Sequence, residues 1–297
     1  MEASTLCSCK ISKKRNRAAR PDDRYRRVLL PHQNAILAGF FLVAAFPRDA
    51  AAKAPDTPTI IKKSVEANKR DFDAAPGYNN KERDRTPEGS KLYQVTMIDG
   101  TPYRRLLAVN GKPLSQSQEA EEIRKQRDAA AQRKAESADQ RRDRLAKYQR
   151  DRTRDHNMMD QLTEAFQFTL TGETRLRGFN VYVLKATPRP GYKPPNMDCQ
   201  VLQGMQGQLW IDQKTYQWVK VTAQVVHPVS IEGFLAQVEP GTRFELEKAP
   251  VDDDVWQPSH FSMRSHAKVL FLINRSSSED QSYFAYSKVS GSTSGKQ

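Results

Sequence analysis

The protein has 297 residues, and its 48 Lys plus Arg against 35 Asp plus Glu give a formal net charge of +13. No apolar run approaches the roughly 20 residues that cross a bilayer as a helix, which excludes a polytopic membrane protein. A charge this basic makes nucleic acid or anionic lipid the first partner to test, and the test is where along the chain the charge lies.

The N-terminal segment has the three parts of a secretory signal peptide, in the right order. Basic residues ending at Arg26-Arg27 precede the uncharged stretch 35–46, and small residues end at Ala52. We expect a signal peptide over about 24–52 with cleavage after Ala52, so that the mature chain is periplasmic. Arg26-Arg27 also resembles a twin-arginine signal, which leaves the export route open, and a buried core helix is the alternative interpretation of the uncharged stretch.

Removal of the leader 1–52 would change both the charge and the cysteine content. The leader holds a net +6 of the +13, and Cys199 is the one cysteine that remains, so the mature chain can form no internal disulfide. Residues 118–155 hold twelve Lys/Arg and nine Asp/Glu, closely interleaved, with Tyr148 as the single aromatic residue. A nucleic-acid surface concentrates basic charge and adds aromatic residues for stacking, so we expect no nucleic-acid partner.

The mature chain opens with a predicted helix over about Pro58–Asp73. Proline suits the first turn of a helix, and Thr57 can cap it. The spacing of Ile61, Val65 and Phe72 places them on one face, which we expect to be buried.

A polar stretch and a hairpin come next. Residues 75–88 contain Pro-Gly and Asn-Asn pairs and predict a loop. Apolar and polar residues alternate over 93–98, as in a half-buried strand, and Asp99-Gly100 is a strong hairpin signal. Residues 105–109 form the expected return strand, and Asn110-Gly111 predicts a second turn of the same type.

Residues 115–157 differ in composition from the rest of the chain and predict a helical insertion. They are rich in Ala, Gln, Glu, Lys and Arg and contain no Gly or Pro. The apolar residues, chiefly Ile123 and Leu145, are too sparse for a coiled coil. Two interpretations stay open: solvated helices that project from the body, or an arm that docks a partner protein.

The C-terminal half has the pattern of short strands with hairpin spacing. Met158–Phe166 predicts a short helix, and Gly172 and Gly178 are expected to flank a turn. The proline-rich stretch 188–195 is expected to be a loop, because proline cannot donate into a sheet. Residues 290–297 predict a disordered tail. Strands are predicted at 166–170, 179–184, 209–211, 219–225, 244–246, 255–273 and 282–289.

These elements predict a mainly β (α+β) fold. We expect a curved antiparallel sheet or open β-barrel of about 9–11 strands, with lid helices and the charged helical insertion. Strands such as 179–184 have apolar residues on both faces and need cover on both sides. We expect a single domain over 53–297.

No constellation of residues predicts catalysis. The sequence contains no P-loop, no GxSxG, no HExxH and no CxxC pair. His260 and His266 would share a strand face but lie roughly 20 Å apart, too far to bind one metal ion. Cys199 has no histidine nearby in the sequence. We therefore expect no enzyme activity, no cofactor and no metal.

Three strand motifs resemble the LolA/LolB-like superfamily of periplasmic lipoprotein carriers and their outer-membrane receptors. Gly207–Lys220, GQLWIDQKTYQWVK, is similar to the superfamily's G-x-L-W-I-D-x-x-T strand and turn with its V-K-V return strand. Val255–Phe261, VWQPSHF, resembles its later W-x-P strand start, and Arg177–Leu184, RGFNVYVL, resembles its G-x-x-x-Y-x-L strand. The resemblance covers roughly 165–289, and the 118–155 segment departs from the compact carriers.

The resemblance implies an open β-barrel with an apolar interior, lidded by helices, that holds acyl chains without covalent chemistry. Its implied partner is a lipid or lipoprotein acyl chain, with peripheral contact to a membrane. Arg104 and Arg105 are candidates, by strand position, for the family's cargo-binding arginine. The apolar strand residues expected to line the cavity are Tyr93, Val95, Phe166, Phe168, Leu170, Val181, Val183, Leu209, Ile211, Val219, Val221, Phe244 and Leu246.

Two other functions stay open. On the same fold, the charged insertion could dock an envelope protein, which would make the chain a structural or regulatory interaction module. An envelope hydrolase has only the cavity in its favour and would need a polar triad that converges there.

Overall fold

The computed structural model describes residues 55–231, 236–269 and 273–290, all of which belong to one unit, Lys53–Gln297. The predicted signal peptide with its cleavage site, and the predicted tail from 291 on, lie outside the described residues. Within the described ranges, no helix combines the length and the apolar character needed to span a membrane.

One antiparallel sheet forms the body of this unit. Its strands are β1 (Tyr78–Thr86), β2 (Gly89–Ile98), β3 (Thr101–Val109), β4 (Lys112–Pro113), β5 (Phe166–Leu176), β6 (Phe179–Pro188), β7 (Met205–Asp212), β8 (Trp218–Val225), β9 (Val229–Ile231), β10 (Ala236–Val238), β11 (Arg243–Pro250), β12 (Trp256–Val269) and β13 (Ile273–Lys288). The order across the sheet is β4-β3-β2-β1-β13-β12-β11-β8-β7-β6-β5, with β10 paired to β12 and β9 to β10. Strands β4 and β5 each have one partner strand among the described residues, so the sheet is open.

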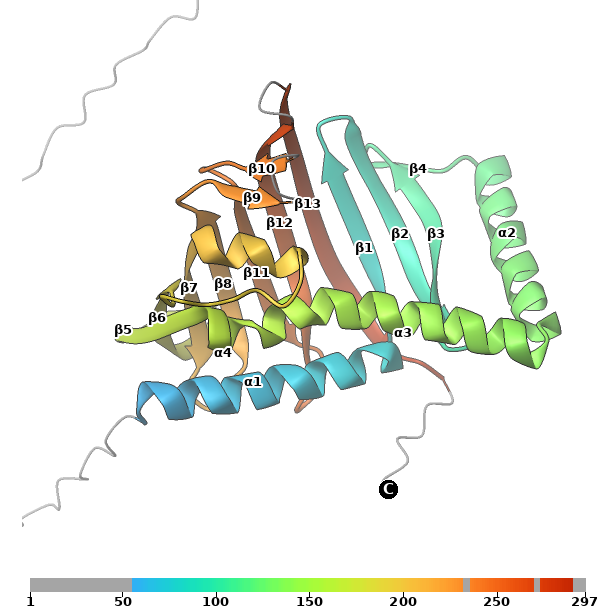
Figure 1. The fold of residues 1–297 in the computed structure, drawn as a ribbon. Helices are drawn as coiled ribbons and strands as arrows, with labels where there is room; N and C mark the ends of the chain where they lie inside the picture. Colours follow the sequence, from blue (N-terminus) through green and yellow to red (C-terminus); the bar gives the residue numbers. More distant parts are fainter. Residues whose placement is uncertain (1–54, 232–235, 270–272, 291–297) are drawn as a thin grey trace, which may run out of the picture. The chain divides into compact units, whose positions relative to one another are not determined.

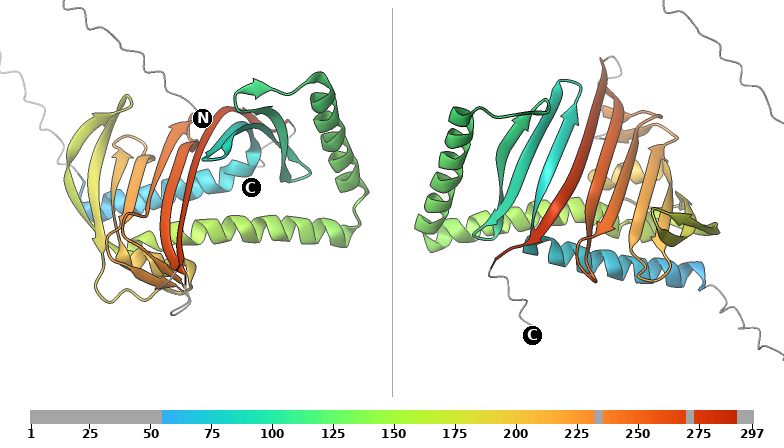
Figure 2. Two further views of the ribbon diagram at one scale, coloured as in Figure 1. Left: turned by 90° about the horizontal axis from the view of Figure 1, so that it is seen from above. Right: turned by 180° about the vertical axis from the view of Figure 1, so that it is seen from behind.

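Helices cover one face of the sheet. They are α1 (Thr57–Ala74), α2 (Gln116–Ala135), α3 (Ala138–Asp160) and α4 (Leu162–Ala165), with the 3-10 helices η1 (Ala75–Gly77) and η2 (Asp198–Gly204). In Figure 1, α1 and α3 run across the strands and α2 stands beside β3. Figure 2 shows the sheet bent across its width and, from behind, the strands in front of α1 and α3. We call the side under α1, α3 and α4 the helix-covered face.

The predicted fold class is confirmed: a curved, open antiparallel sheet with lid helices, and a charged helical insertion that forms α2 and α3. The sheet has thirteen strands rather than 9–11. The strands that were not predicted are the short β4, β9 and β10 and the segment predicted as a loop, which forms β1 instead. Its sequence, YNNKERDRT, has no apolar alternation, and the strand is held by pairing to β2 on one side and β13 on the other.

Local sequence sets the ends of the helices. α1 begins after Asp56, whose carboxylate accepts a hydrogen bond from the Thr59 N–H at 3.0 Å, so the cap is not the predicted Thr57. α2 begins with a capping box in which Ser115 and Gln118 each bind the other's backbone N–H.

The predicted hairpin turn at Asp99-Gly100 joins β2 to β3, with φ values of 48° and 83° that suit a type I′ turn. Arg177 and Gly178 close the β5–β6 hairpin with φ values of 51° and 92°. Gly172, expected to flank that turn, lies inside β5 at a register shift. This bulge places one unpaired residue in the edge strand.

Candidate binding site

The helix-covered face is apolar over β5 to β8 and β11. Alternate residues of these strands, such as Leu184, Leu209 and Val221, pack with Ile60 and Ile61 of α1. This periodicity of two on the strands, set against the helix face, produces the main hydrophobic core. Its other buried members are Ala165, Phe166, Tyr182, Ala186, Cys199, Leu202, Met205, Ile211, Trp218 and Val225.

A small cavity remains inside this core. Its volume is about 50 Å³. One water takes up about 30 Å³ in the liquid, and ligand pockets are roughly 300–1,000 Å³, so the chamber is nearly filled by its own side chains. The residues that line it are Leu162, Phe166, Phe168, Ala186, Leu202, Met205, Gly207, Leu209, Trp218, Val221, Thr222, Ala223, Phe244 and Leu246.

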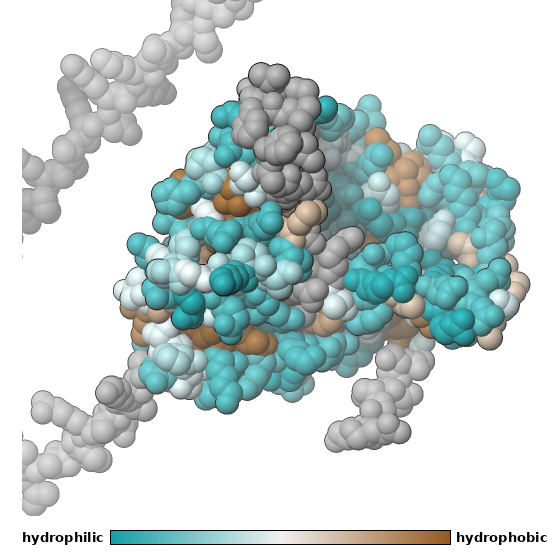
Figure 3. Space-filling view, in the orientation of Figure 1, coloured by the Kyte–Doolittle hydropathy of each residue, from teal (hydrophilic) through white to brown (hydrophobic). Residues whose placement is uncertain are grey.

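The surface over this chamber has a narrow apolar seam. Figure 3 shows the helix side as mainly hydrophilic, with hydrophobic residues reaching the surface in a strip between α1 and α4. Val65 of α1 and Leu162 of α4 are partly buried and pack against the core beneath. Leu162 of α4 and Leu202 of η2 also line the chamber itself.

Six of the residues predicted to line a cavity surround this one: Phe166, Phe168, Leu209, Val221, Phe244 and Leu246. Leu170 and Ile211 pack in the same core but do not line the cavity. With Ala186 of β6, the chamber draws on the consecutive strands β5 to β8 and on β11.

Val181, Val183 and Val219 are not brought to the cavity. They lie on the opposite face of the sheet, in a second cluster with Trp256 and Trp210. On β6 the residues that face the core are Tyr182, Leu184 and Ala186. Because β6 is apolar on both faces, its alternation alone cannot say which set points inward.

Beyond β11, the helix-covered face becomes charged. The register pairs Leu246 with Phe261, Phe261 with Gln281, and Gln281 with Asp84 of β1. Cross-strand partners share a face, so the side that holds the cavity continues onto β1 and β2. Tyr93 and Val95, also predicted to line the cavity, lie on β2 at this end.

Arg104 of β3 is the centre of this charged end. Its Nη2 lies 2.7 Å from Glu82 Oε1 and 2.6 Å from Asp84 Oδ2, and its guanidinium is 4.2 Å from the centroid of the Tyr93 ring. Burial raises the pKa of Glu82 to about 7, helped by its hydrogen bond to Asp84 and opposed by the charge of Arg104. The predicted cargo-binding Arg104 is therefore already paired, beside a carboxyl group that titrates near neutral pH.

A polar stripe of α1 was not predicted from the sequence. Ser64, Asn68 and Asp71 are buried and share one helix face by their spacing. Ser64 Oγ accepts a hydrogen bond from Trp218 Nε1 at 2.7 Å, and Asn68 Oδ1 accepts one from Lys248 Nζ at 2.9 Å. The signal was present in the sequence as polar residues at i, i+4 and i+7 next to the apolar face.

Asp71 ties α1 to three parts of the sheet. Its carboxylate forms an ion pair with Lys248 Nζ and accepts hydrogen bonds from Gln217 Nε2 at 3.0 Å and from the Trp256 N–H at 2.9 Å. Burial lowers the pKa of Lys248, and the charge of Asp71 opposes that effect. Each buried polar group in the stripe is thus paired, which fixes α1 to the sheet.

The helical insertion is fastened to the β2–β3 turn by two arginines. Arg133 Nη1 donates to the carbonyl oxygens of Ile98 and Thr101 at 2.8 and 2.9 Å. Arg144 Nη1 donates to Asp99 O at 3.0 Å and to Thr101 Oγ1 at 2.8 Å. The insertion is therefore bound to the body by these contacts, while most of its side chains remain exposed.

The described residues contain no group of three or more His, Cys, Asp or Glu placed to hold a metal ion. His260 Nε2 lies 3.0 Å from Asp280 Oδ2, and His266 Nδ1 lies 3.0 Å from Ser276 Oγ. The two rings thus have separate partners. Cys199 is fully buried in the core.

Neither a protein-family model nor a curated protein sequence matches the chain. Solved structures to which it is similar include a LolA superfamily protein from Nitrosomonas europaea, with 12% identity, TM-score 0.31, and coverage of 79% of this chain and 94% of that one. A DUF1329 family protein from Desulfovibrio piger gives 8% identity, TM-score 0.28 and coverage of 79% and 93%. A chain of the Pseudomonas aeruginosa MucA/MucB complex gives 11%, 0.22, 75% and 94%.

Proposed function

We propose that the protein is a non-enzymatic periplasmic binding protein that holds a lipid or lipoprotein acyl chain in the apolar chamber of the helix-covered face. The observation that carries this proposal is the wall of the chamber. Apart from Thr222 and Gly207, every residue that lines it has a largely apolar side chain, and the one indole N–H among them, of Trp218, is engaged by Ser64 Oγ. A dry wall of this kind favours hydrocarbon over any polar ligand.

An acyl chain requires the chamber to open. The 50 Å³ volume is far below that of a fatty acid, so one wall must move. The helices that contribute to its lining are α4, through Leu162, and η2, through Leu202, and α4 is a single turn of four residues. α1 is held to the sheet by the buried contacts of Asp71 and contributes no lining residue. The moving wall in this proposal is α4 with η2. Burial of each methylene contributes about 0.8 kcal/mol to the binding free energy, so ten methylenes contribute roughly 8 kcal/mol. This contribution offsets the free energy needed to open the chamber.

The proposal includes export of the chain. The predicted signal peptide and cleavage after Ala52 would release a single domain, 53–297, into the periplasm. There, acyl groups of lipids and lipoproteins lie at both membrane surfaces, within reach of a protein that makes peripheral contact.

The test is direct. The purified protein is extracted with organic solvent and the extract is analysed by mass spectrometry, and uptake of a fluorescent fatty acid is titrated in parallel. We expect bound lipid and saturable uptake. Leu162→Glu, which places a carboxylate in the chamber wall, should weaken uptake at least tenfold. Leu176→Glu is the matched control, since Leu176 is also partly buried but packs in the cluster on the opposite face.

Two results would count against the proposal. One is the absence of both co-purifying lipid and fatty-acid uptake in the unmodified protein. The other is an equal loss of uptake in the two variants, which would place the binding site outside the chamber.

A second candidate is an interaction module that docks an envelope protein through the insertion. The observation in its favour is Ile123 of α2, a large apolar side chain that is 39% exposed on an otherwise charged helix. Under this proposal Ile123→Ser abolishes capture of the envelope partner and leaves fatty-acid uptake unchanged. Loss of uptake with capture intact would reject it.

A further inference from the structure

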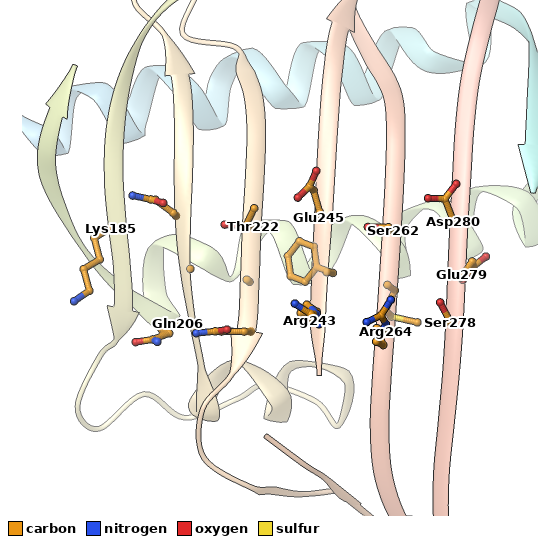
Figure 4. A pocket seen from close by; sticks show the side chains of 16 residues that line it. Lys185, Gln206, Thr222, Arg243, Glu245, Ser262, Arg264, Ser278, Glu279 and Asp280 are labelled. Atoms are coloured by element: carbon orange, nitrogen blue, oxygen red, sulfur yellow. The ribbon is translucent and has the colours of Figure 1, made fainter. Parts of the chain in front are cut away.

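The face of the sheet opposite the helices carries a polar groove of about 810 Å³. It is lined by residues of β6, β7, β8, β11, β12 and β13, which are neighbours in the sheet (Figure 4). Thr222 and Gln224 line it, and they alternate along β8 with Val221 and Val225, which are buried in the core. The groove thus lies on the other side of the sheet from the apolar chamber, although Gly207, Thr222, Ala223 and Phe244 of the shared strands line both. Binding in the groove does not rest on the proposed function.

One row of side chains crosses the floor of this groove. The register pairs Gln206 with Gln224, Gln224 with Arg243, Arg243 with Arg264, and Arg264 with Ser278. Figure 4 shows Gln206, Arg243, Arg264 and Ser278 at the same level across the strands. The row holds two arginines and otherwise only amide and hydroxyl groups.

The two arginines are placed against each other. Arg243 and Arg264 are directly opposite on neighbouring antiparallel strands, where side chains of like charge destabilise the pair. Among the described residues, neither guanidinium forms a hydrogen bond or an ion pair. The carboxylates that line the groove are engaged elsewhere: Glu245 with Lys220, Glu279 with Gln281, and Asp280 with His260 and Arg85.

We propose that this row binds a phosphoryl group. A phosphate monoester carries about −1.5 to −2 charges at neutral pH and a phosphate diester about −1, and two adjacent guanidinium groups attract either. Each arginine can donate in a bidentate fork, and a phosphoryl group has enough oxygens to accept from both forks. A single carboxylate has two oxygens, which one fork already satisfies. Gln224 and Ser278 are placed beside the forks to donate to a remaining oxygen.

The dimensions of the groove suit a phosphoryl group that is part of a larger molecule. Six adjacent strands span roughly 24 Å at about 4.8 Å each, and the groove extends beyond the arginine pair over β8, β7 and β6 on one side and over β13 on the other. The same phosphoryl chemistry occurs in soluble phosphate esters and in the headgroups of anionic lipids, and the test separates these two sources.

The experiment compares the melting temperature in inorganic phosphate with that in acetate at equal ionic strength. Phosphate at ten times its dissociation constant shifts the folding equilibrium about elevenfold. For a protein of this size we expect Tm to rise by roughly 3–6 °C. In the variant Arg243→Gln/Arg264→Gln this rise should vanish. The variant should fold, because in acetate it has lost a repulsive pair and should melt at or above the temperature of the unmodified protein.

The matched control is Arg70→Gln/Arg150→Gln, which removes the same charge from exposed positions on α1 and α3. It should keep the full response to phosphate. A second arm measures sedimentation with vesicles of phosphatidylglycerol in phosphatidylcholine, against pure phosphatidylcholine. Binding that is confined to the phosphatidylglycerol vesicles and lost in the groove variant supports the site with a lipid headgroup as the source. Binding of inorganic phosphate supports it with a soluble source.

Three outcomes overturn the proposal. The first is the absence of a response to both inorganic phosphate and phosphatidylglycerol. The second is a response to acetate equal to that to phosphate, which would reject phosphoryl recognition. The third is an equal loss of response in the groove variant and in the control variant. That result would mean that the effect of phosphate depends on the net charge of the protein and not on the arginine pair.

Discussion

Replacing Lys248 by methionine tests whether the polar stripe of α1 fixes that helix to the sheet. Lys248 and Asp71 form a buried ion pair, with side chains that are 7% and 4% exposed. Methionine keeps most of the volume of the lysine stem but removes its charge. Asp71 would keep its hydrogen bonds from Gln217 and the Trp256 N–H while losing its only cation among the described residues.

The expected loss of stability is large. Removing one partner of a buried ion pair costs about 3–5 kcal/mol, because the remaining charge is left buried without compensation. In a protein of this size each kcal/mol lowers Tm by about 2–4 °C, so the variant should melt roughly 6–20 °C lower. In Asp71→Leu/Lys248→Met both charges are absent, and we expect it to be more stable than Lys248→Met alone.

Guanidinium denaturation followed by circular dichroism measures these differences. The control is Lys69→Met on the same helix, which breaks the exposed 3.2 Å ion pair with Asp73. Both of its side chains are more than half exposed, so the cost should stay below about 0.5 kcal/mol.

A loss below about 1 kcal/mol in Lys248→Met would refute the reasoning, since the pair would then behave like an exposed one. Additive effects of the two substitutions in the double variant would also refute it. Additivity would mean that Asp71 and Lys248 do not act on each other.

Three further predictions follow from other contacts. Between pH 4.5 and about 7 the stability contributed by Glu82 should fall, because its folded pKa of about 7 lies above its ordinary value of 4.5. That contribution is complete below pH 4.5 and lost as the pH rises through about 7, and Glu82→Gln should flatten this part of the curve of Tm against pH. Arg144→Met should lower the free energy of unfolding by about 1.5–3 kcal/mol and speed amide hydrogen exchange in the β2–β3 turn, because Arg144 donates to Asp99 O and Thr101 Oγ1 there. Exchange in that turn at the rate of the unmodified protein would contradict this prediction. Gly100→Ala should lower the free energy of unfolding, measured by urea denaturation, by about 1–2 kcal/mol, because φ is 83° and the new Cβ would lie 2.9 Å from Leu145 Cδ2. Gly111→Ala, with φ 75° and open space around the new Cβ, should lose less.

Most of the sheet could be predicted because its strands follow local rules. The β2–β3 hairpin combines alternating residues with an Asp-Gly turn, and both signals lie within a few residues of each other. The same holds for the helical insertion, whose composition and Ser115 capping box need no distant contact.

β1 could not be predicted, because what makes it a strand lies far away in the sequence. Its neighbours are β2 and β13, and the latter pairs with it across some two hundred residues, as in Tyr78 with Lys288. Its charged residues fit because Arg104 of β3 lies within reach of Glu82 and Asp84. The loop-like sequence of β1 forms a strand because β2 and β13 pair with its two edges.

The candidate site was predictable in composition but not in geometry. Six of the proposed lining residues meet at the cavity, while Val181, Val183 and Val219 lie on the other face. A strand that is apolar on both faces gives no information about its inward side until a helix is placed. The arginine row of the groove was equally hidden, because Arg243 and Arg264 become neighbours through strand pairing alone.

The edge strand β5 bears on how copies of the protein meet. Its outer backbone groups have no partner strand among the described residues, and such an edge can template the addition of a strand from a second molecule. The register shift at Gly172 interrupts the straight run of donors and acceptors, and the exposed charges of Glu173 and Arg175 follow directly after it. Together they leave only the short run before Gly172 open to pairing, so the fold protects itself against growth into a fibre along this edge.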